Sequence, residues 1–145
     1  MYKVEQIKKP LENYRDIEAF KIYVSDLGLL CVKKDLLAND ILFMSEELND
    51  FKGGMVENYV QVQLMIKGYQ TYYWQSQRGA EIDFVIQREG KLIPIEVKAA
   101  DNTKAKSLNI FMETYQPAYA IKLSTKNFGY KDGKKTVPLY ATFCI

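Results

Sequence analysis

Two short stretches of the chain place charged side chains inside otherwise apolar runs. Asp83 interrupts EIDFVI, and Glu96 and Lys98 interrupt LIPIEVK. An ionised group in such a run is costly unless it is paired or bound to a metal ion. Carboxylate oxygens suit Mg²⁺, and a bound metal ion lowers the pKa of its water and stabilises charge on a phosphoryl oxygen. The pattern suggests metal-assisted attack of water on a phosphoryl group, with Asp83 and Glu96 as metal ligands and Lys98 orienting the water or supporting the developing charge.

A third acid, Glu57, lies in GGMVENYVQVQL, whose apolar spacing predicts a helix directly before these strands. If that helix packs on the sheet near Asp83, Glu57 can support the metal ion or position a water. An acidic pair beside a lysine is also what a solvated salt-bridge cluster on an exposed sheet face contains. Both interpretations stay open at this point.

The absence of histidine narrows the chemistry. The chain has 145 residues and no histidine, which excludes an imidazole base and zinc sites that need an imidazole ligand. Any chemistry must use carboxylates, lysines, tyrosines and a metal ion that prefers oxygen.

Strand alternation decides whether the charged residues can meet, because residues two apart share a face. In LIPIEVK the apolar face holds Ile93, Ile95 and Val97, so Glu96 and Lys98 lie together on the other face. In EIDFVI the alternation predicts an apolar face of Ile82, Phe84 and Ile86, with Asp83 pointing away from it. The short REGK turn would then bring Asp83 near Glu96 and Lys98.

The elements around these strands predict an α/β fold in which helices flank a central mixed sheet. A helix from residue 53 is followed by strands in YQTYYWQ, EIDFVI and LIPIEVK, a helix over 104–115 and a strand in AYAIKLS. The short links between the first three strands favour an antiparallel meander. Before this αβββαβ core we expect a strand over Phe20–Val24 and a helix over 33–50; after it we expect a loop, NFGYKDGKK, and a last strand, PLYATFCI.

This arrangement resembles the PD-(D/E)xK, or restriction-endonuclease-like, superfamily. The matching residues are Asp83 in EIDFV and Glu96 and Lys98 in IEVK, with Glu57 as the acid often supplied by the first helix. The proline that precedes the aspartate in the motif is replaced by Ile82. The resemblance covers residues 53–124 and implies a nuclease-like fold and a Mg²⁺ or Mn²⁺ site formed by Asp83, Glu96 and Glu57.

A second resemblance covers nearly the whole chain. Five segments are similar to an uncharacterised C-terminal domain of prokaryotic AAA-type ATPases: FKIYVSDLGLL, GGMVENYVQVQL, YYWQSQRGAEIDFVI, PIEVKAADNTKAKSL and the ending VPLYATFCI. No GxxxxGK[ST] loop for ATP phosphates occurs in the sequence, so we expect no ATP site in this chain. The resemblance implies a single nuclease-like domain over 1–145, with an N-terminal extension (1–52), the core (53–124) and a C-terminal loop and strand (125–145), and favours a fragment of a larger ATPase.

Charge and composition suggest the partners. Residues 88–145 carry 10 Lys or Arg against 5 Asp or Glu, a bias that can attract a polyanion such as DNA. Lys104 and Lys106 could contact phosphates, although solvated lysines are an open alternative. No apolar run suits a membrane span or a signal peptide, so we expect a cytoplasmic protein. The alternative to a nuclease is a catalytically silent domain of that ATPase that binds nucleic acid, regulates the ATPase or binds a partner protein.

Overall fold

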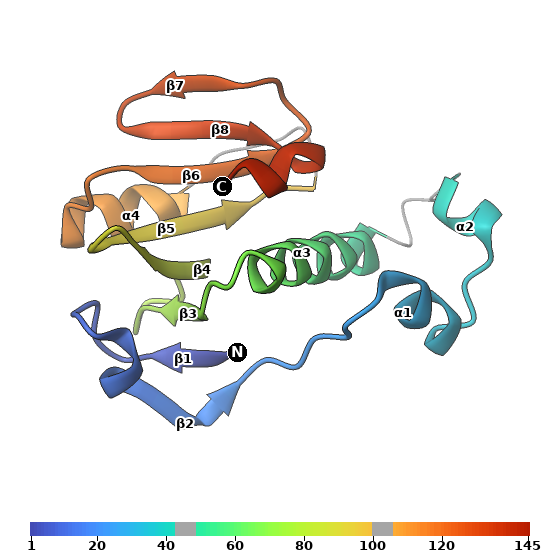
Figure 1. The fold of residues 1–145 in the computed structure, drawn as a ribbon, viewed down its shortest axis with the longest axis horizontal. Helices are drawn as coiled ribbons and strands as arrows, with labels where there is room; N and C mark the ends of the chain where they lie inside the picture. Colours follow the sequence, from blue (N-terminus) through green and yellow to red (C-terminus); the bar gives the residue numbers. More distant parts are fainter. Residues whose placement is uncertain (43–48, 100–105) are drawn as a thin grey trace.

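The centre of the fold is the antiparallel meander that the sequence predicts. The computed structural model describes residues 1–42, 49–99 and 106–145. Strands β3 (Thr71–Gln75), β4 (Glu81–Arg88) and β5 (Lys91–Val97) pair in that order, each antiparallel to the next (Figure 1). Arg88 pairs with Lys91, so Glu89 and Gly90 form a two-residue turn in which both have positive φ, as tight hairpins require.

The helices and the next strand follow in the predicted order. Helix α3 (Asn49–Ile66) leads into β3, and α4 (Lys106–Tyr115) leads into β6 (Ala120–Ser124), which runs parallel to β5. The αβββαβ order and the α/β fold with a mixed sheet are therefore confirmed. In place of one helix over 33–50, the structure has α2 (Ala38–Leu42) and the start of α3 at Asn49, with 43–48 outside the described residues.

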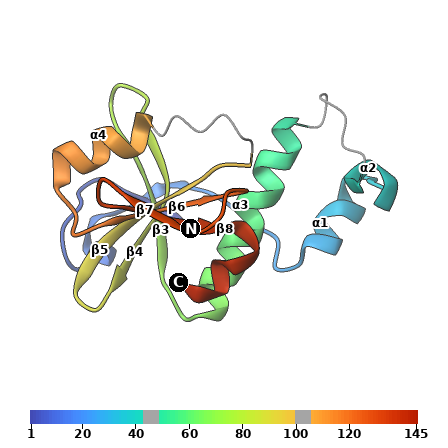
Figure 2. The same cartoon turned by 90° about the horizontal axis from the view of Figure 1, so that it is seen from above.

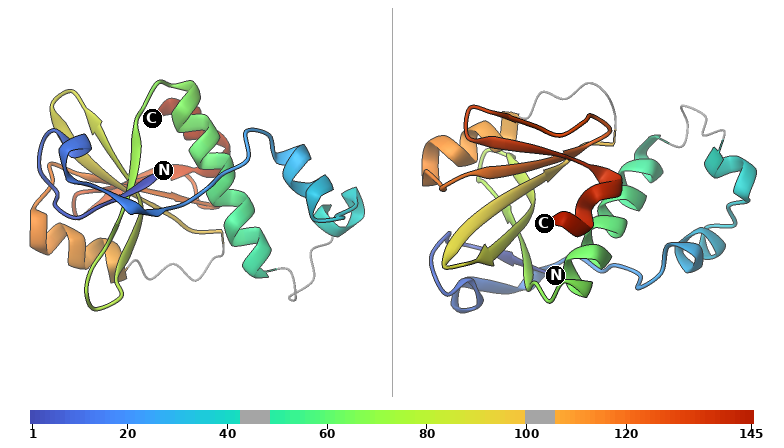
Figure 3. Two further views of the ribbon diagram at one scale, coloured as in Figure 1. Left: turned by 90° about the horizontal axis from the view of Figure 1, so that it is seen from below. Right: turned by 45° about the horizontal axis from the view of Figure 1, so that its top comes forward.

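The N-terminal extension adds two strands to the same sheet. Strand β1 (Tyr2–Val4) runs parallel to β3, and β2 (Arg15–Phe20) pairs antiparallel with β1 at the edge; the short helix η1 (Leu11–Tyr14) precedes β2. The prediction of a strand over Phe20–Val24 is wrong, because β2 ends at Phe20; Lys21 still exchanges backbone hydrogen bonds with Met1, and the chain then crosses towards α1 (Leu27–Lys33) outside any strand. Helices α1 and α2 lie on the far side of α3 from the sheet (Figures 1 and 3).

The C-terminal segment differs from the prediction in both of its parts. The expected loop NFGYKDGKK contains β7 (Gly129–Lys131) and the start of β8 (Lys134–Pro138), joined through Asp132 and Gly133, both of positive φ. The expected last strand is a 3₁₀ helix, η3 (Leu139–Cys144), in which the Thr142 hydroxyl donates to the Leu139 carbonyl at 2.6 Å. Over the described residues, the sheet has eight strands in the order β2-β1-β3-β4-β5-β6-β8-β7.

Apolar residues fill both faces of this sheet, with α4 on one face and α3 and η3 on the other (Figure 2). On the α4 face, Leu108 and Phe111 pack with Trp74, whose ring meets that of Phe111 edge-on at 5.2 Å between centroids. On the α3 face, the fully buried side chains include Val60, Leu64, Phe84, Ile86, Ile93, Ile95 and Leu123. Within the described ranges, no helix combines the length and the apolar character that crossing a membrane requires.

A β-bulge interrupts β4 at the residue that matters most for the site. Tyr72 of β3 pairs with Val85, and Trp74 pairs with Ile82, so two steps along β3 oppose three along β4. This count is that of a bulge, which commonly re-aims a side chain.

The bulge changes which residues share a face of β4. Ile82 and Val85 belong to the core on the α4 face, whereas Phe84 and Ile86 belong to the core on the α3 face. The prediction that Ile82, Phe84 and Ile86 share one face is therefore wrong: alternation fails between Ile82 and Phe84, at Asp83. The prediction for β5 is confirmed, with Ile93 and Ile95 buried together on the α3 face.

Candidate functional site

Asp83 lies where strands β4 and β5 separate. The paired residues of these strands run from Arg88 and Lys91 to Phe84 and Ile95, and Asp83 is the next residue of β4. Its side chain replaces the missing backbone pairing, because Oδ2 accepts a hydrogen bond from the backbone N–H of Val97 at 2.6 Å. We call this separation the fork; its two branches are the end of β4 that carries Asp83 and the end of β5 with Glu96 and, directly after it, Lys98. The bulge and the end of the ladder together hold the Asp83 carboxylate where the branches separate.

Glu96 and Lys98 lie on the other branch of the fork. Glu96 is buried at 3% exposure, and its Oε1 lies 2.5 Å from the Lys98 ammonium nitrogen. Its second oxygen, Oε2, is buried and has no hydrogen-bond partner within the described part of the chain. A buried carboxylate oxygen without a donor is unfavourable unless something else satisfies it. The backbone N–H of Lys98 donates to the Leu123 carbonyl of β6 at 2.8 Å, which fixes this branch.

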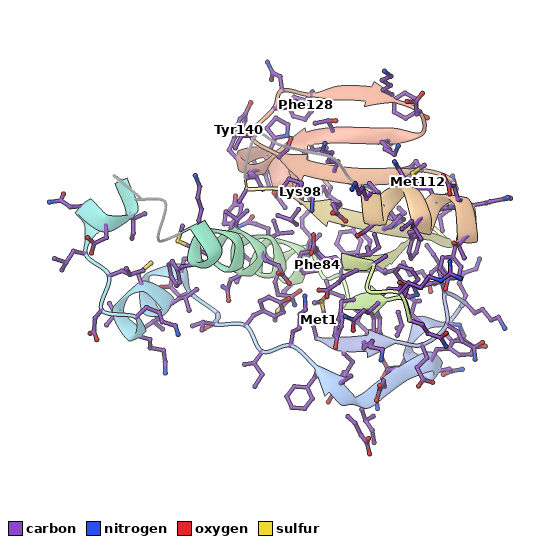
Figure 4. All side chains as sticks on the ribbon, turned by 180° about the vertical axis from the view of Figure 1, so that it is seen from behind. Met1, Phe84, Lys98, Met112, Phe128 and Tyr140 are labelled. Carbon is purple, nitrogen blue, oxygen red and sulfur yellow. The ribbon has the colours of Figure 1, made fainter. Side chains whose placement is uncertain are left out.

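Glu57 approaches the fork from α3, as the sequence predicts, but it already has two partners. Its Oε1 accepts from the Lys21 ammonium at 3.0 Å and from the Tyr23 hydroxyl. Lys21 also reaches Glu81 of β4, with 2.5 Å between Nζ and Oε1. We call Glu57, Glu81, Asp83 and Glu96 the acidic cluster. The segment between β2 and α1 therefore contributes a lysine, Lys21, and a tyrosine, Tyr23, to the surroundings of this cluster. In Figure 4, Phe84 and Lys98 lie near the middle of the molecule, where α3 meets the sheet.

The neighbouring acids affect the pKa of Asp83. Burial raises the pKa of the Asp83 carboxyl to about 7; the charges of Glu96 and Glu57 act in the same direction, and the Val97 N–H and Lys98 oppose them. Such a carboxyl is partly protonated at neutral pH. Carboxylates that repel one another in this way favour a cation among them.

The two lysines of the cluster remain charged. Burial lowers the pKa of Lys98, but the hydrogen bond and the charge of Glu96, together with the charge of Asp83, outweigh it, so the pKa lies above its usual value. The same balance holds for Lys21, where Glu81 and Glu57 outweigh burial. Burial and the hydrogen bond to Glu57 raise the pKa of Tyr23, which stays a neutral hydroxyl donor.

The residues fit a hard divalent cation in some respects. Asp83 and Glu96 would supply oxygen ligands, one of them the unsatisfied Glu96 Oε2, and two protein carboxylates are enough for Mg²⁺, which keeps several waters. Among residues 1–42, 49–99 and 106–145, however, no three acidic, cysteine or histidine side chains come together as ligands of one ion. The roles of Asp83, Glu96 and Glu57 as metal ligands therefore stay predictions.

The predicted nucleic-acid contacts are further from the fork or outside the structure. Lys104 lies outside the described residues, and Lys106 is the exposed first residue of α4. Lys122 of β6 is paired in register with Glu96. Burial and then the nearby charges of Lys126, Lys98 and Lys134 lower the pKa of Lys122, against the opposing charge of Glu96.

Sequence reasoning missed Lys21, Tyr23 and the role of Glu81. Lys21 and Tyr23 occur in FKIYVSDLGLL, where alternation reads as a strand. The signal that could have revealed them is that lysine and tyrosine share one face of that stretch, opposite Ile22, which is exposed. A polar face on an apparent strand indicates that its side chains have polar partners on other elements.

The comparison with known protein families assigns the chain to one family. Residues 52–142 match the family described as Domain of unknown function (DUF4143). The chain belongs to this family. No curated protein and no solved structure gives a significant match to this DUF4143 chain. The matched range contains every acid and lysine of the fork, whereas Lys21 and Tyr23 lie before it.

Proposed function

We propose that this DUF4143 domain is a Mg²⁺- or Mn²⁺-dependent phosphodiesterase of the PD-(D/E)xK kind that acts on DNA. The observation that carries the proposal is the fork itself: Asp83 and the Glu96–Lys98 pair lie on its two branches, which are joined by the 2.6 Å hydrogen bond that the Val97 N–H donates to Asp83. The αβββαβ order supports it, because the resemblance to that superfamily implies an acid on the second strand and an acid and a lysine on the third; here Asp83 is on β4, Glu96 is on β5 and Lys98 follows β5 directly.

The residues would divide the work as follows. Asp83 and Glu96 would hold the cation, which supplies a more acidic water and stabilises charge on the phosphoryl oxygens. Lys98 carries a proton at neutral pH, since its pKa lies above the usual value. It therefore serves as a hydrogen-bond donor to developing negative charge and not as the base that takes a proton from water. The Val97 N–H holds Asp83 in place.

The test is cleavage of supercoiled plasmid by the purified domain with Mg²⁺ or Mn²⁺. The proposal requires cleavage that EDTA stops and that D83N and K98M each lower by roughly 100-fold or more. Equal activity in both variants would show that the cleavage comes from elsewhere. Lys91→Met is the matched control, because Lys91 lies exposed at the other end of the same strand, β5.

A second candidate is a silent nucleic-acid-binding or regulatory domain of an AAA-type ATPase. One observation favours it: Glu57 is already neutralised by Lys21, and within the described ranges no third ligand joins Asp83 and Glu96. This candidate requires DNA binding that weakens steeply with salt and does not depend on a metal ion, or a stable complex with the ATPase module. Metal-dependent binding would exclude its DNA-binding form.

A further inference from the structure

The Lys21 ammonium occupies the part of the acidic cluster that faces α3. It lies 3.0 Å from Glu57 Oε1 and 2.5 Å from Glu81 Oε1, and 5.0 Å from the centre of the Tyr73 ring. Two carboxylates and an aromatic face around one ammonium group form a cation site whose occupant is part of the chain. Asp83 lies close enough for the charge of Glu57 to raise its pKa.

Lys21 belongs to a segment that is fastened at its ends. The Lys21 backbone N–H donates to the Met1 carbonyl at 2.8 Å, and the Met1 amino group donates to the Lys21 carbonyl at 3.0 Å. Two further bonds of 2.8 Å join the Val24 N–H and carbonyl to the side-chain amide of Asn58. The Lys21 and Tyr23 side chains add the contacts to Glu57 between these fixed points.

Open space lies on both sides of this segment. Lys21, Ile22 and Tyr23 line one cavity of about 370 Å³ towards Phe20 and another of about 500 Å³ towards α1 and Glu57. Ile22 between them is 84% exposed. The Lys21 side chain can therefore change position without disturbing the packed core.

We propose that Lys21 is a tethered counter-cation of the acidic cluster, whose ammonium group competes with a divalent cation for the carboxylate of Glu57. The inference rests on the cation site of the proposed function and deepens it, since it assigns control of that site. With Lys21 in place, a divalent cation has Asp83 and Glu96 as its protein ligands. When Lys21 moves away, Glu57 keeps only the neutral Tyr23 hydroxyl as a partner and can join them, so the site gains a ligand and a negative charge.

The geometry makes the competition direct. One oxygen of Glu57, Oε1, accepts from both Lys21 and Tyr23. A cation that takes this oxygen must displace the ammonium group, and the reverse also holds, because coupling between two ligands is reciprocal. Loss of the Lys21 charge therefore favours the divalent cation twice, through the free oxygen and through the removal of a nearby like charge.

The test is a calorimetric titration of Mn²⁺ into the full chain and its variants at fixed pH and low salt. Lys21→Met should bind Mn²⁺ at least about fivefold more tightly than wild type, the lower end of typical coupling between two ligands. Lys21→Arg keeps the charge and should bind as wild type does. Adding Glu57→Gln to Lys21→Met should remove the gain. Lys34→Met is the matched control, because Lys34 lines the same cavity from the end of α1.

An unchanged or weaker affinity in Lys21→Met overturns the inference. A second measurement needs no variant and covers the case in which Lys21→Met does not fold. In NMR spectra of methylated lysines of the wild-type chain, saturating Mg²⁺ should shift the Lys21 signal and leave that of Lys34 in place. An unmoved Lys21 signal also overturns the inference. Plasmid cleavage tests the nuclease separately. If D83N loses cleavage but Lys21→Met binds Mn²⁺ as wild type does, the nuclease stands and the role of Lys21 falls. If D83N cleaves as wild type does but Lys21→Met binds Mn²⁺ more tightly, the role of Lys21 stands and the nuclease falls.

Discussion

The carboxylate of Asp83 accepts a hydrogen bond of 2.6 Å from the backbone N–H of Val97, one residue before Lys98. The bond joins the two branches of the fork at the point where their backbone ladder ends. It also gives Asp83 a donor that holds its orientation. The position of Asp83 on β4 relative to Glu96 of β5 and to Lys98, which follows β5 directly, is thus set by the backbone of β5.

Asp83 should make the stability of the domain depend on pH. Its pKa in the folded chain is about 7, above the ordinary value of an aspartate, so the folded state holds this proton while the unfolded chain has released it. This group therefore stabilises the fold less and less as the pH rises from about 4 to 7. D83N removes that dependence and should be more stable than wild type at pH 8 by roughly 1–3 kcal/mol, with little difference at pH 4.

Urea unfolding of wild type and D83N at several pH values measures this difference. Asp132→Asn is the matched control, because Asp132 lies exposed in the β7–β8 turn and asparagine accepts its positive φ. If D83N loses stability with rising pH as steeply as wild type, Asp83 does not carry the raised pKa.

Lys98 should stabilise the fold through Glu96. Lys98→Met leaves both oxygens of a carboxylate that is 3% exposed without a described side-chain donor, which costs roughly 1–3 kcal/mol. Glu96→Gln in the same chain removes the charge and should recover most of the loss, as a double-mutant cycle detects. Unfolding at pH 7 measures both, and Lys91→Met should cost little. An additive double mutant would show that the two side chains do not depend on each other.

The sequence predicts those elements whose patterns are local. The meander, α3, α4 and β6 follow from apolar periodicity and short turns, and the acids and lysine of the fork follow from charges that interrupt apolar strands. Tertiary context decided the places where prediction failed. The bulge at Asp83 depends on how β3 pairs with β4, a register that no single strand specifies.

The failed predictions at the ends of the chain have similar causes. Asp132-Gly133 is a common hairpin turn, but its polar surroundings resemble a loop. The alternating PLYATFCI resembles a strand, yet its buried residues, which include Ala141, Thr142 and Ile145, belong to a 3₁₀ helix and the chain end. Lys21 and Tyr23 escaped notice because their acidic partners lie 36 and 34 residues further on, at Glu57.

Tyr23 should contribute to stability through its hydroxyl. Tyr23→Phe keeps the ring against Phe84, whose centre lies 6.4 Å away, and removes the hydrogen bond to Glu57. We expect a loss of about 1 kcal/mol in the free energy of unfolding, as for an ordinary partly buried hydrogen bond. Tyr140→Phe serves as control because Tyr140 is 69% exposed in η3. Equal stability of Tyr23→Phe and wild type would mean that the Tyr23 hydroxyl adds nothing to the fold.

Phe111 should be the main apolar anchor of α4. It is fully buried and meets the rings of Trp74 and Tyr115 at 5.2 and 4.8 Å between centroids. Phe111→Ala should lower the free energy of unfolding by about 3–5 kcal/mol. Ile110→Ala should lower it by less than about 1 kcal/mol, because Ile110, on the same helix, is 44% exposed. Chemical unfolding of the two variants compares the costs, and similar values would show that α4 does not pack as described.

The most direct test of the cation site is a calorimetric titration of Mn²⁺ into the wild-type chain and into an Asp83→Asn/Glu96→Gln double variant. A short DNA duplex whose phosphates can complete the coordination shell should be present in both titrations. The account predicts saturable binding by the wild type that the double variant loses, although the variant remains folded. Equal binding by both chains, or none by the folded wild type, would contradict the claim that Asp83 and Glu96 form a metal site.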